Sequence, residues 1–308
     1  MFAACLLWLV SAGAVLAAQQ SPTATIGVSD DADVDEWLQA VLRDAEVGDA
    51  RTQFVVGGYY ETGVGGAPDY AQALKWYRRA AEQGLTDAQR AMGVMYHFGQ
   101  GVEQDYAAAV QWYLRAAANG DPIAENNLGV MYQRGTGVPE NYREAVRWFE
   151  QSALHGHLPG LANLGNMYVQ GLGVPKDADK GVRMIREVAD SGDAGAMADL
   201  AVIYHEGDGV PEDQNEALKW CKLAAEGGHP IAAYTLAKLY LRGEGVPVNR
   251  VEALLWFIVA DARLSTHAGS PEQHVEFAES RDALLVLLRP EQVEEVRRRA
   301  KQILSELP

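Results

Sequence analysis

The sequence is poor in cysteine and in basic side chains. Cys5 and Cys221 are the only cysteines among 308 residues, and 26 Lys and Arg face 42 Asp and Glu, which gives a formal net charge of −16. Binders of nucleic acid or of anionic membranes need clustered basic charge, so the acidic balance excludes both classes. Apolar residues make up 48% of the chain. This share is enough for a hydrophobic core and excludes wholesale disorder.

Charged residues are also absent from the first 18 positions, MFAACLLWLVSAGAVLAA. The apolar run ends in small residues and the chain turns polar at Gln19, so residues 1–18 are predicted to be a signal peptide cleaved after Ala17 or Ala18. Because no Lys or Arg precedes the run, an uncleaved N-terminal anchor is the alternative. Either way we expect a periplasmic or secreted protein, with no membrane insertion after signal cleavage.

Glycine is abundant, with 31 residues, and an internal repeat of 36 residues accounts for most of them. A tyrosine and a Gly-x-Gly pair recur in register six times. The tyrosines are Tyr60, Tyr96, Tyr132, Tyr168, Tyr204 and Tyr240, and the first glycines of the pairs are Gly63, Gly99, Gly135, Gly171, Gly207 and Gly243. A tryptophan recurs in the second half of five of the six repeats.

Each repeat contains two segments of helical periodicity. In the third repeat, residues 122–134 place Leu128 and Tyr132 on one face, and residues 141–154 form the second segment. Gly129, next to Leu128, allows the partner helix to come close. The Gly-x-Gly loop is predicted to adopt positive φ and to reverse the chain. The second helix is predicted to be capped by Asp69, Asp105, Asn141, Asp177, Asp213 and Asn249.

The tryptophan and tyrosine columns are predicted to lie in the core, because they fall on the apolar face of each helix. Cys221 stands where most other repeats have an aromatic residue. We therefore interpret Cys221 as a small buried hydrophobe rather than a reactive thiol. Removal of Cys5 with the signal peptide would leave Cys221 as the single thiol, without an internal disulfide.

The pattern resembles the Sel-1-like repeat family, a relative of the tetratricopeptide repeat with a longer glycine loop. The matching string is clearest at Leu128-Gly129-x-x-Tyr132-x-x-Gly135-x-Gly137-Val138, followed by Ala145-x-x-Trp148. The resemblance covers residues 50 to 263 and implies an all-α fold, a right-handed α-solenoid of six 36-residue helix-turn-helix repeats.

The ends of the chain depart from the repeat, as the caps of a solenoid do. We expect a disordered lead at residues 19–32, an N-terminal capping helix at 33–48, the six repeats at 49–263 and C-terminal capping helices at 264–308. Two helices are predicted in that last segment, at about 271–288 and 290–307.

The sequence offers no motif for catalysis. Gly-x-Ser-x-Gly, Ser-x-x-Lys and His-Glu-x-x-His are all absent. Some cysteine-rich relatives in the resembled family have been linked to penicillin binding, but they carry a cysteine pair in each repeat and this chain carries none. We therefore predict that the protein is not an enzyme and has no catalytic residues, no metal site and no cofactor.

The resemblance implies an interaction protein, because members of that family act as adaptors for assemblies and as regulators of envelope signalling. We expect a scaffold, adaptor or regulator that binds a partner protein or peptide along the concave face of the solenoid. Two alternatives remain open. One is a cell-wall-related hydrolase or amide-binding enzyme, and the other is a structural part of an envelope secretion or export assembly.

The related tetratricopeptide fold also implies where a partner would lie, which is along the first helices, beside the Leu-Gly pair and just beyond the tyrosine. Transferred to this sequence, these positions are Arg90, His97, Asn126, Asn127, Gln133, Arg134, Asn163, Asn166, Asp199, His205, Lys238 and Arg242. Cations and amides at such positions can hold the backbone and the carboxylates of a peptide.

Overall fold

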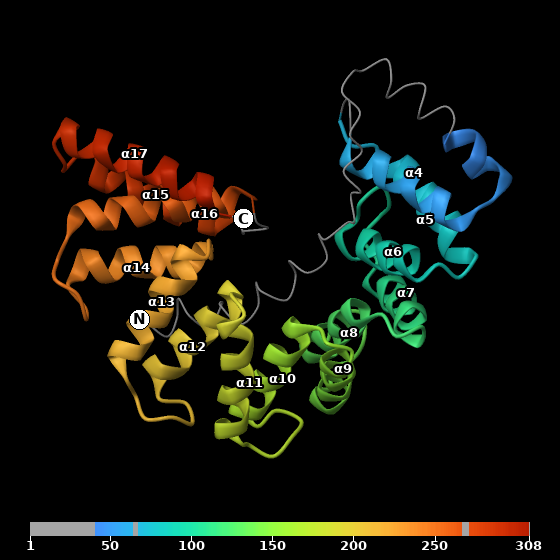
Figure 1. Ribbon diagram of the computed structural model, residues 1–308, viewed down its shortest axis with the longest axis horizontal. Coiled ribbons are helices and arrows are strands. Elements are labelled where there is room, and N and C mark those ends of the chain that lie inside the picture. The colour runs from blue at the N-terminus through green and yellow to red at the C-terminus, as the bar shows by residue number, and fades with distance from the viewer. Residues whose placement is uncertain (1–40, 64–66, 267–270, 308) are drawn as a thin grey trace. The chain divides into compact units, whose positions relative to one another are not determined.

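The computed structural model describes residues 41–63, 67–266 and 271–307, and these residues form helices and loops without a β-strand (Figure 1). The predicted signal peptide and the lead at residues 19–32 lie outside the described residues. Of the predicted N-terminal capping helix, only residues 41–48 are described, and residues 41–47 are helical.

Six consecutive pairs of helices follow the 36-residue period, and all but the last helix have 13 residues. The pairs are α4 (Ala50–Thr62) with α5 (Tyr70–Glu82), α6 (Thr86–Phe98) with α7 (Tyr106–Ala118), α8 (Pro122–Arg134) with α9 (Tyr142–Leu154), α10 (Leu158–Gln170) with α11 (Ala178–Asp190), α12 (Ala194–Glu206) with α13 (Gln214–Glu226), and α14 (Pro230–Arg242) with α15 (Arg250–Thr266). The predicted all-α solenoid of helix pairs is confirmed.

The described residues divide into two compact units, with the boundary in the sequence between Gly160 and Leu161. Within the N-terminal unit, α4 packs on α5, α6 on α7 and α8 on α9, and α5 and α7 also contact the first helices of the next repeats, α6 and α8. Within the C-terminal unit the same order holds for α11 to α15. From α4 to α9 and from α11 to α15, each helix therefore packs against its neighbours in the sequence.

The loops between paired helices contain the helix-capping residues that the sequence predicts. Gly135 ends α8 with a φ of +65°, and its N–H donates to the carbonyl of Met131. Asn141 begins α9, because its side-chain oxygen accepts from the backbone nitrogens of Arg143 and Glu144 at 3.1 and 3.3 Å. Side-chain contacts of the same kind are made by Asp69, Asp105, Asp177, Asp213 and Asn249.

In the first three repeats the two helices meet where a glycine faces an aromatic ring. A Cβ atom at Gly129 would lie 2.4 Å from Cε1 of Phe149, so glycine is what allows α8 to approach α9 this closely. Gly57 and Gly93 have the same relation to the rings of Tyr77 and Tyr113, with equal distances of 2.4 Å. The close approach that the sequence assigns to the Leu-Gly position is therefore a contact between backbone and ring.

The prediction that the tryptophan and tyrosine columns form the core is partly wrong. Trp112 and Trp148 are half-buried, as are all six repeated tyrosines, whereas the ring that follows Trp148, Phe149, is fully buried. Successive residues of a helix are about 100° apart, so one position along the chain separates the edge of the apolar stripe from its centre. The buried column is Tyr77, Tyr113, Phe149, Ile185, Cys221 and Phe257.

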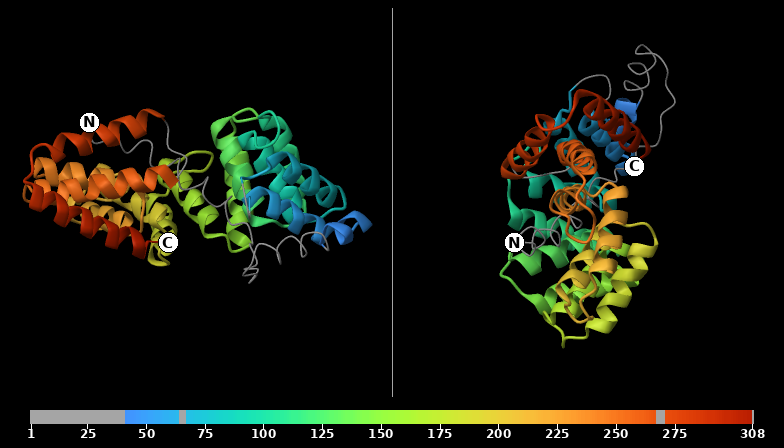
Figure 2. Two further views of the ribbon diagram at one scale, coloured as in Figure 1. Left: turned by 90° about the horizontal axis from the view of Figure 1, so that it is seen from above. Right: turned by 90° about the vertical axis from the view of Figure 1, so that its left-hand side faces the viewer.

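Two further helices, α16 (Pro271–Leu285) and α17 (Pro290–Glu306), follow the sixth repeat and pack against α15 (Figures 1 and 2). The ring of Phe277 on α16 stacks on Tyr234 of α14 with centroids 4.0 Å apart. Arg299 on α17 makes two hydrogen bonds to the carboxylate of Glu252, at 2.6 and 3.1 Å. The two helices therefore cover the side of the sixth repeat on which a seventh repeat would otherwise pack.

Replacement of Gly137 by alanine is expected to weaken the N-terminal unit. Gly137 has a φ of +73°, and a Cβ atom there would lie 2.5 Å from the carbonyl oxygen of Tyr106 in the preceding repeat. Gly156, with a φ of +82° and nothing within 4 Å of such an atom, is the matched control. Both variants carry the cost of left-handed backbone, about 1–2 kcal/mol, and Gly137→Ala adds a clash between repeats. Urea denaturation should show the larger loss for Gly137→Ala, and equal losses would contradict the contact.

Candidate partner-binding surface

All twelve residues that the sequence selects for partner binding lie on first helices. They are Arg90 and His97 on α6, Asn126, Asn127, Gln133 and Arg134 on α8, Asn163 and Asn166 on α10, Asp199 and His205 on α12, and Lys238 and Arg242 on α14. Their neighbourhoods differ from one repeat to the next, which decides what each side chain can offer to a partner.

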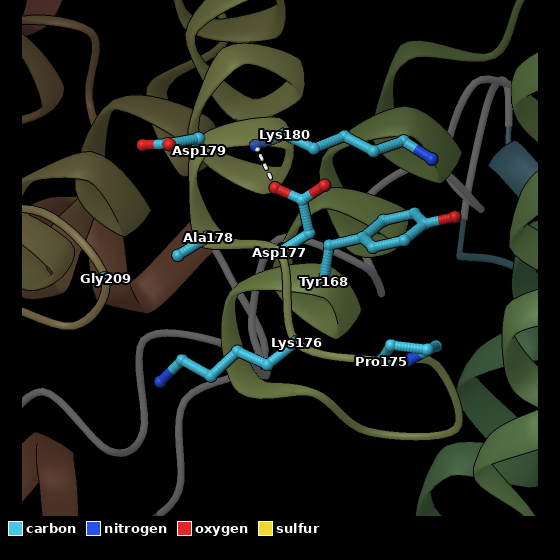
Figure 3. A pocket seen from close by; sticks show the side chains of 8 residues that line it. All are labelled: Tyr168, Pro175, Lys176, Asp177, Ala178, Asp179, Lys180 and Gly209. Carbon is cyan, nitrogen blue, oxygen red and sulfur yellow. Dashed lines mark hydrogen bonds between the residues drawn. The ribbon is translucent and has the colours of Figure 1, made fainter.

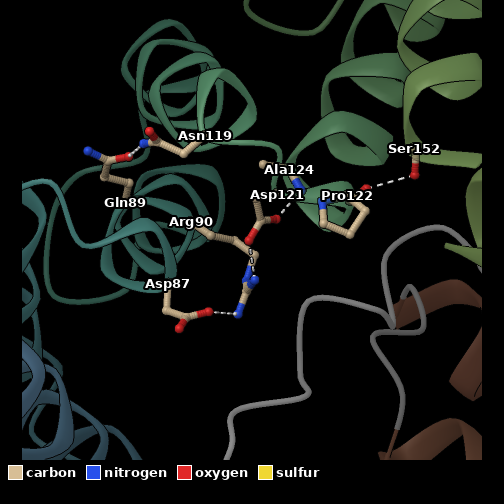
Figure 4. A network of polar contacts seen from close by, with 8 residues as sticks. All are labelled: Asp87, Gln89, Arg90, Asn119, Asp121, Pro122, Ala124 and Ser152. Atoms are coloured by element: carbon tan, nitrogen blue, oxygen red, sulfur yellow. Dashed lines mark hydrogen bonds and ion pairs between the residues drawn. The ribbon is translucent and has the colours of Figure 1, made fainter. Parts of the chain in front are cut away.

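Arg90 takes part in a network that joins two repeats of the N-terminal unit (Figure 4). Its guanidinium pairs with Asp121 and, at 3.0 Å, with Asp87. Asp121 is buried and also caps α8, because it accepts from the backbone nitrogen of Ala124 at 2.7 Å. The charge of Arg90 therefore balances a buried capping carboxylate, and the residue works as a link between α6 and α8.

The two cations predicted on α14 also have acidic neighbours. Nζ of Lys238 lies 3.5 Å from a carboxylate oxygen of Glu276 and 4.8 Å from the centre of the Tyr234 ring. The guanidinium of Arg242 lies 3.8 Å from the carboxylate of Glu244. These pairs reduce the positive potential that α14 would present to an acidic partner.

Two of the predicted amides lie inside the repeats instead of on the surface. Asn126 is 0% exposed and Asn166 is 6% exposed. The side chain of Asn166 donates to a carboxylate oxygen of Asp199 at 2.6 Å, and so joins α10 to α12. The pKa of Asp199 is raised to about 7, mainly because the carboxylate is buried; the bond from Asn166 opposes this shift and the negative charge of Asp193 adds to it.

A column of buried polar side chains on the first helices was not predicted. Gln53 and Gln89 are 36 residues apart and only 4% and 7% exposed. The amide of Gln53 donates to the carbonyl of Ala45 at 3.0 Å, and that of Gln89 donates to Ala81 at 3.3 Å. Each bond crosses from a first helix to the second helix that precedes it. The spacing of Gln53, Gln89 and Glu125 was the available sequence signal.

The same column is bonded to the end of the second helix within each repeat. Asn119 donates to the Gln89 side chain at 3.2 Å, as Figure 4 shows, and Gln83 donates to Gln53 at 2.9 Å. In the third repeat the pair is Glu125 and His155, with 2.8 Å between the carboxylate and Nδ1. These polar side chains therefore hold neighbouring helices of the N-terminal unit together. Because they are engaged in the interior, other side chains must form the surface that binds a partner.

An aromatic cluster remains at the surface of the N-terminal unit. The ring of His97 lies 4.7 Å from that of Phe98 and 5.2 Å from that of Tyr106. Phe98 is 40% exposed and Tyr106 is 36% exposed. Loss of hydration lowers the pKa of His97, and the charge of nearby Arg134 lowers it further, so the imidazole is neutral at pH 7. The cluster combines two exposed rings, a neutral histidine and a cation.

A hollow of about 480 Å³ lies beside the loop between α10 and α11 (Figure 3). Nζ of Lys180 lies 3.8 Å from the centre of the Tyr168 ring, and Asp177 accepts from the backbone nitrogen of Lys180 at 3.0 Å. Lys176 pairs with Asp208 at 2.6 Å. These side chains hold the glycine loops in place, and we assign no ligand to the hollow.

Chemically reactive arrangements are not found among the described residues. No group of three or more His, Cys, Asp or Glu side chains is placed to hold a metal ion within the ranges 41–63, 67–266 and 271–307. Cys221 is buried, and burial raises the pKa of its thiol to about 12. None of the described helices has both the length and the apolar character needed to cross a bilayer.

The helix pairs, the Gly-x-Gly loops and the buried ring column define a repeat protein of the α-solenoid class. The Sel1 repeat matches six consecutive segments, at residues 50–85, 86–121, 122–157, 158–193, 194–229 and 230–260. The chain belongs to the Sel1 repeat family. Proteins of this family are typically scaffolds for protein–protein interaction and are generally non-catalytic.

Two solved structures resemble the chain over most of its length. The Sel1 repeat protein from Oxalobacter formigenes is 31% identical, with 81% of this chain and 97% of that chain covered and a TM-score of 0.67. A protective antigen present in uropathogenic Escherichia coli strains, which displays an SLR fold, is 32% identical, with 80% of this chain and 56% of that chain covered and a TM-score of 0.61. The chain thus spans little more than half of that antigen. No curated protein matches the chain.

The raised pKa of Asp199 predicts a pH-dependent stability of the C-terminal unit. Because the folded pKa of about 7 lies above the ordinary aspartate value of 3.8, protonation of Asp199 favours the folded state, and this contribution is lost as the pH rises through 7. Asp199→Asn should therefore raise the free energy of unfolding at pH 8 by about 1–3 kcal/mol and change it little at pH 4.

Urea denaturation at pH 4 and pH 8 measures this difference. Asp190→Asn, at an exposed position on α11, is the control and should leave the pH dependence unchanged. A gain for Asp199→Asn that is equal at both pH values would contradict the assignment of the shift to Asp199.

Proposed function

We propose that the protein is an exported scaffold that binds a partner protein or peptide along its first helices. The exposed aromatic cluster of His97, Phe98 and Tyr106, with Arg134 beside it, is the observation that carries this proposal. The scaffolding role typical of Sel1 repeat proteins supports it.

The cluster has the composition of an interface hot spot. Aromatic residues and arginine contribute most to the energy of protein interfaces, because they bury a large area at a low cost in conformational entropy. Phe98 ends α6 and Tyr106 begins α7, so the rings lie at both ends of one glycine loop. A partner segment that covered the rings would also meet the cation of Arg134.

The ion pairs of the first helices change which residues carry the interaction. Arg90, Lys238 and Arg242 have carboxylates within 4 Å, so their contribution to binding is expected to be small. Gln133 on α8 is half-buried and supplies the polar edge of the surface in the N-terminal unit, whereas Asn127 turns its amide nitrogen inward. The proposed interface is therefore aromatic at its centre and polar at its edge.

Export is part of the proposal and rests on the charge-free apolar start of the chain, residues 1–18, and on the change to polar sequence at Gln19. Whether the start is cleaved or retained as an anchor decides if the scaffold diffuses or stays at the membrane.

A double variant tests the interface. Phe98→Ala with Arg134→Ala removes one exposed ring and one cation, and the control Leu154→Ala with Arg147→Ala removes an exposed aliphatic side chain and a cation on α9. A partner captured from envelope extracts with the chain lacking residues 1–18 should bind the first variant about 30-fold more weakly, or about 2 kcal/mol.

The control should bind like the parent, and both variants should keep the parent melting temperature. Equal affinity of the two variants would contradict an interface centred on the cluster.

The export proposal predicts the N-terminus of the protein in its native cell. Mass spectrometry should find a chain that begins at Ala18 or Gln19, because signal peptidase cuts after small residues. Recovery of the intact chain from the membrane fraction would favour the anchor, and recovery of intact chain from the cytoplasm would contradict export.

A further inference from the structure

A cavity of about 310 Å³ lies in the C-terminal unit, among α12, α13 and α14. Its wall is formed by Ala201, Ala217, Leu218, Cys221, Thr235 and Leu239, and its volume is at the lower end of the range for small-ligand pockets. The polar side chains of His205 and Gln214, with 2.9 Å between Nδ1 and Oε1, lie at the same cavity.

The repeat pattern explains why space is present here. In the first three repeats the ring of Tyr77, Tyr113 or Phe149 lies against a glycine of the first helix. The fifth repeat has Ala201 at the glycine position and Cys221 at the ring position. The methyl group of Ala201 fills less space than the missing ring would, so a cavity remains. The side chains around the cavity keep the helices apart.

Two residues that line the cavity are slightly exposed to solvent, whereas the residues at the equivalent positions of the third repeat are not. Ala217 is 7% exposed and Cys221 is 5% exposed, while the equivalent Ala145 and Phe149 of the third repeat are both 0% exposed. A small solute can therefore reach this cavity.

Thr235 adds a polar group to the wall. The residue is 6% exposed, and its hydroxyl is buried without a hydrogen-bond partner among the residues that the structure describes. A buried hydroxyl without a partner costs about 1–3 kcal/mol. A ligand that offered a hydrogen-bonding group at this point would relieve that cost.

The equivalent position in the N-terminal unit shows which group fits. Thr235 and Cys221 are the counterparts, 108 residues later, of Asn127 and Tyr113. Asn127 is close enough to the Tyr113 hydroxyl to lower the pKa of that phenol against the effect of burial. The phenol ring of the second repeat thus faces a polar side chain of the third, whereas between the fifth and sixth repeats there is a cavity beside Thr235.

We propose that the cavity binds a phenol ring, with the chemistry of a tyrosine side chain, and that a tyrosine of the partner peptide supplies it. The ring lies in the space that the missing ring of the fifth repeat leaves beside the methyl group of Ala201, and its hydroxyl bonds to Oγ1 of Thr235. The peptide as the source rests on the proposed scaffold function, whereas the fit of the ring rests on the cavity alone. An apolar cavity that lacks its own side chain accepts aromatic rings of matching size.

The direct test is a titration of the full chain with p-cresol, the tyrosine side chain as a free molecule. NMR signals of the Leu218 and Leu239 methyl groups should shift on binding. Cys221→Phe, which supplies a ring from within, should abolish the shifts, and Cys221→Ser, which keeps the space, should retain them.

Should Cys221→Phe fail to fold, its combination with Ala201→Gly restores the glycine and ring pair of the third repeat. Absence of binding by the parent, or undiminished binding by a folded ring variant, would overturn the proposal.

Thr235→Val tests the hydroxyl contact, because it keeps the shape of the side chain and removes the oxygen. Binding of p-cresol should weaken about fivefold, and binding of toluene should stay unchanged. Equal effects on the two probes would overturn the contact with Thr235.

A second titration, with N-acetyltyrosinamide, separates a peptide source from a free phenol. Binding that is lost in Cys221→Phe supports a tyrosine of a peptide, and binding of p-cresol without binding of the amide would overturn that source. Neither titration needs the partner, so these results are independent of the Phe98 and Arg134 variant.

Discussion

The contact between a glycine backbone and an aromatic ring is the constraint on which the first three helix pairs depend. At Gly129 the first helix lies so near the ring of Phe149 that a single methyl group would overlap it. This approach buries the ring completely and fixes the distance between the two helices. The positive φ of Gly135 and Gly137 then returns the chain at the right point for the next contact. The spacing of the paired helices thus follows from a small residue placed opposite a large one, and the glycine loops make this contact recur in the next repeat.

Polar side chains supply the order that this packing lacks, since apolar contacts alone tolerate exchange between similar repeats. Gln53 and Gln89 each bond to the preceding second helix and to the end of their own, and Arg90 joins two repeats through Asp121. Of the cations predicted to bind a partner, Arg90, Lys238 and Arg242 have acidic neighbours. Exposed rings such as Phe98 are therefore the stronger candidates for contact with a partner.

The sequence predicts most of the helices and loops because their signals are local. An Asn or Asp before a helix and a glycine after it act within four residues, so Asn141 and Gly135 could be placed from spacing alone. The ring column was missed by one position, because the apolar stripe of a helix is wide enough to include both Trp148 and Phe149. The partners of Arg90 and Asn166 lie 31 and 33 residues away, and such pairs depend on the packing of helices that no single repeat encodes.

The burial of Cys221 makes its thiol a probe of local unfolding in the fifth repeat. It is the only cysteine among the described residues, and its thiol faces the interior with a hydrogen bond to the carbonyl of Ala232 at 3.5 Å. A thiol reagent too large to enter the cavity beside Cys221 reacts with it only when α13 and α14 separate, so the rate of labelling reports the free energy of that opening. The repeats have similar helices, so their circular dichroism signals overlap. Labelling of Cys221 reports on the fifth repeat alone, and it therefore distinguishes local opening of this repeat from global unfolding.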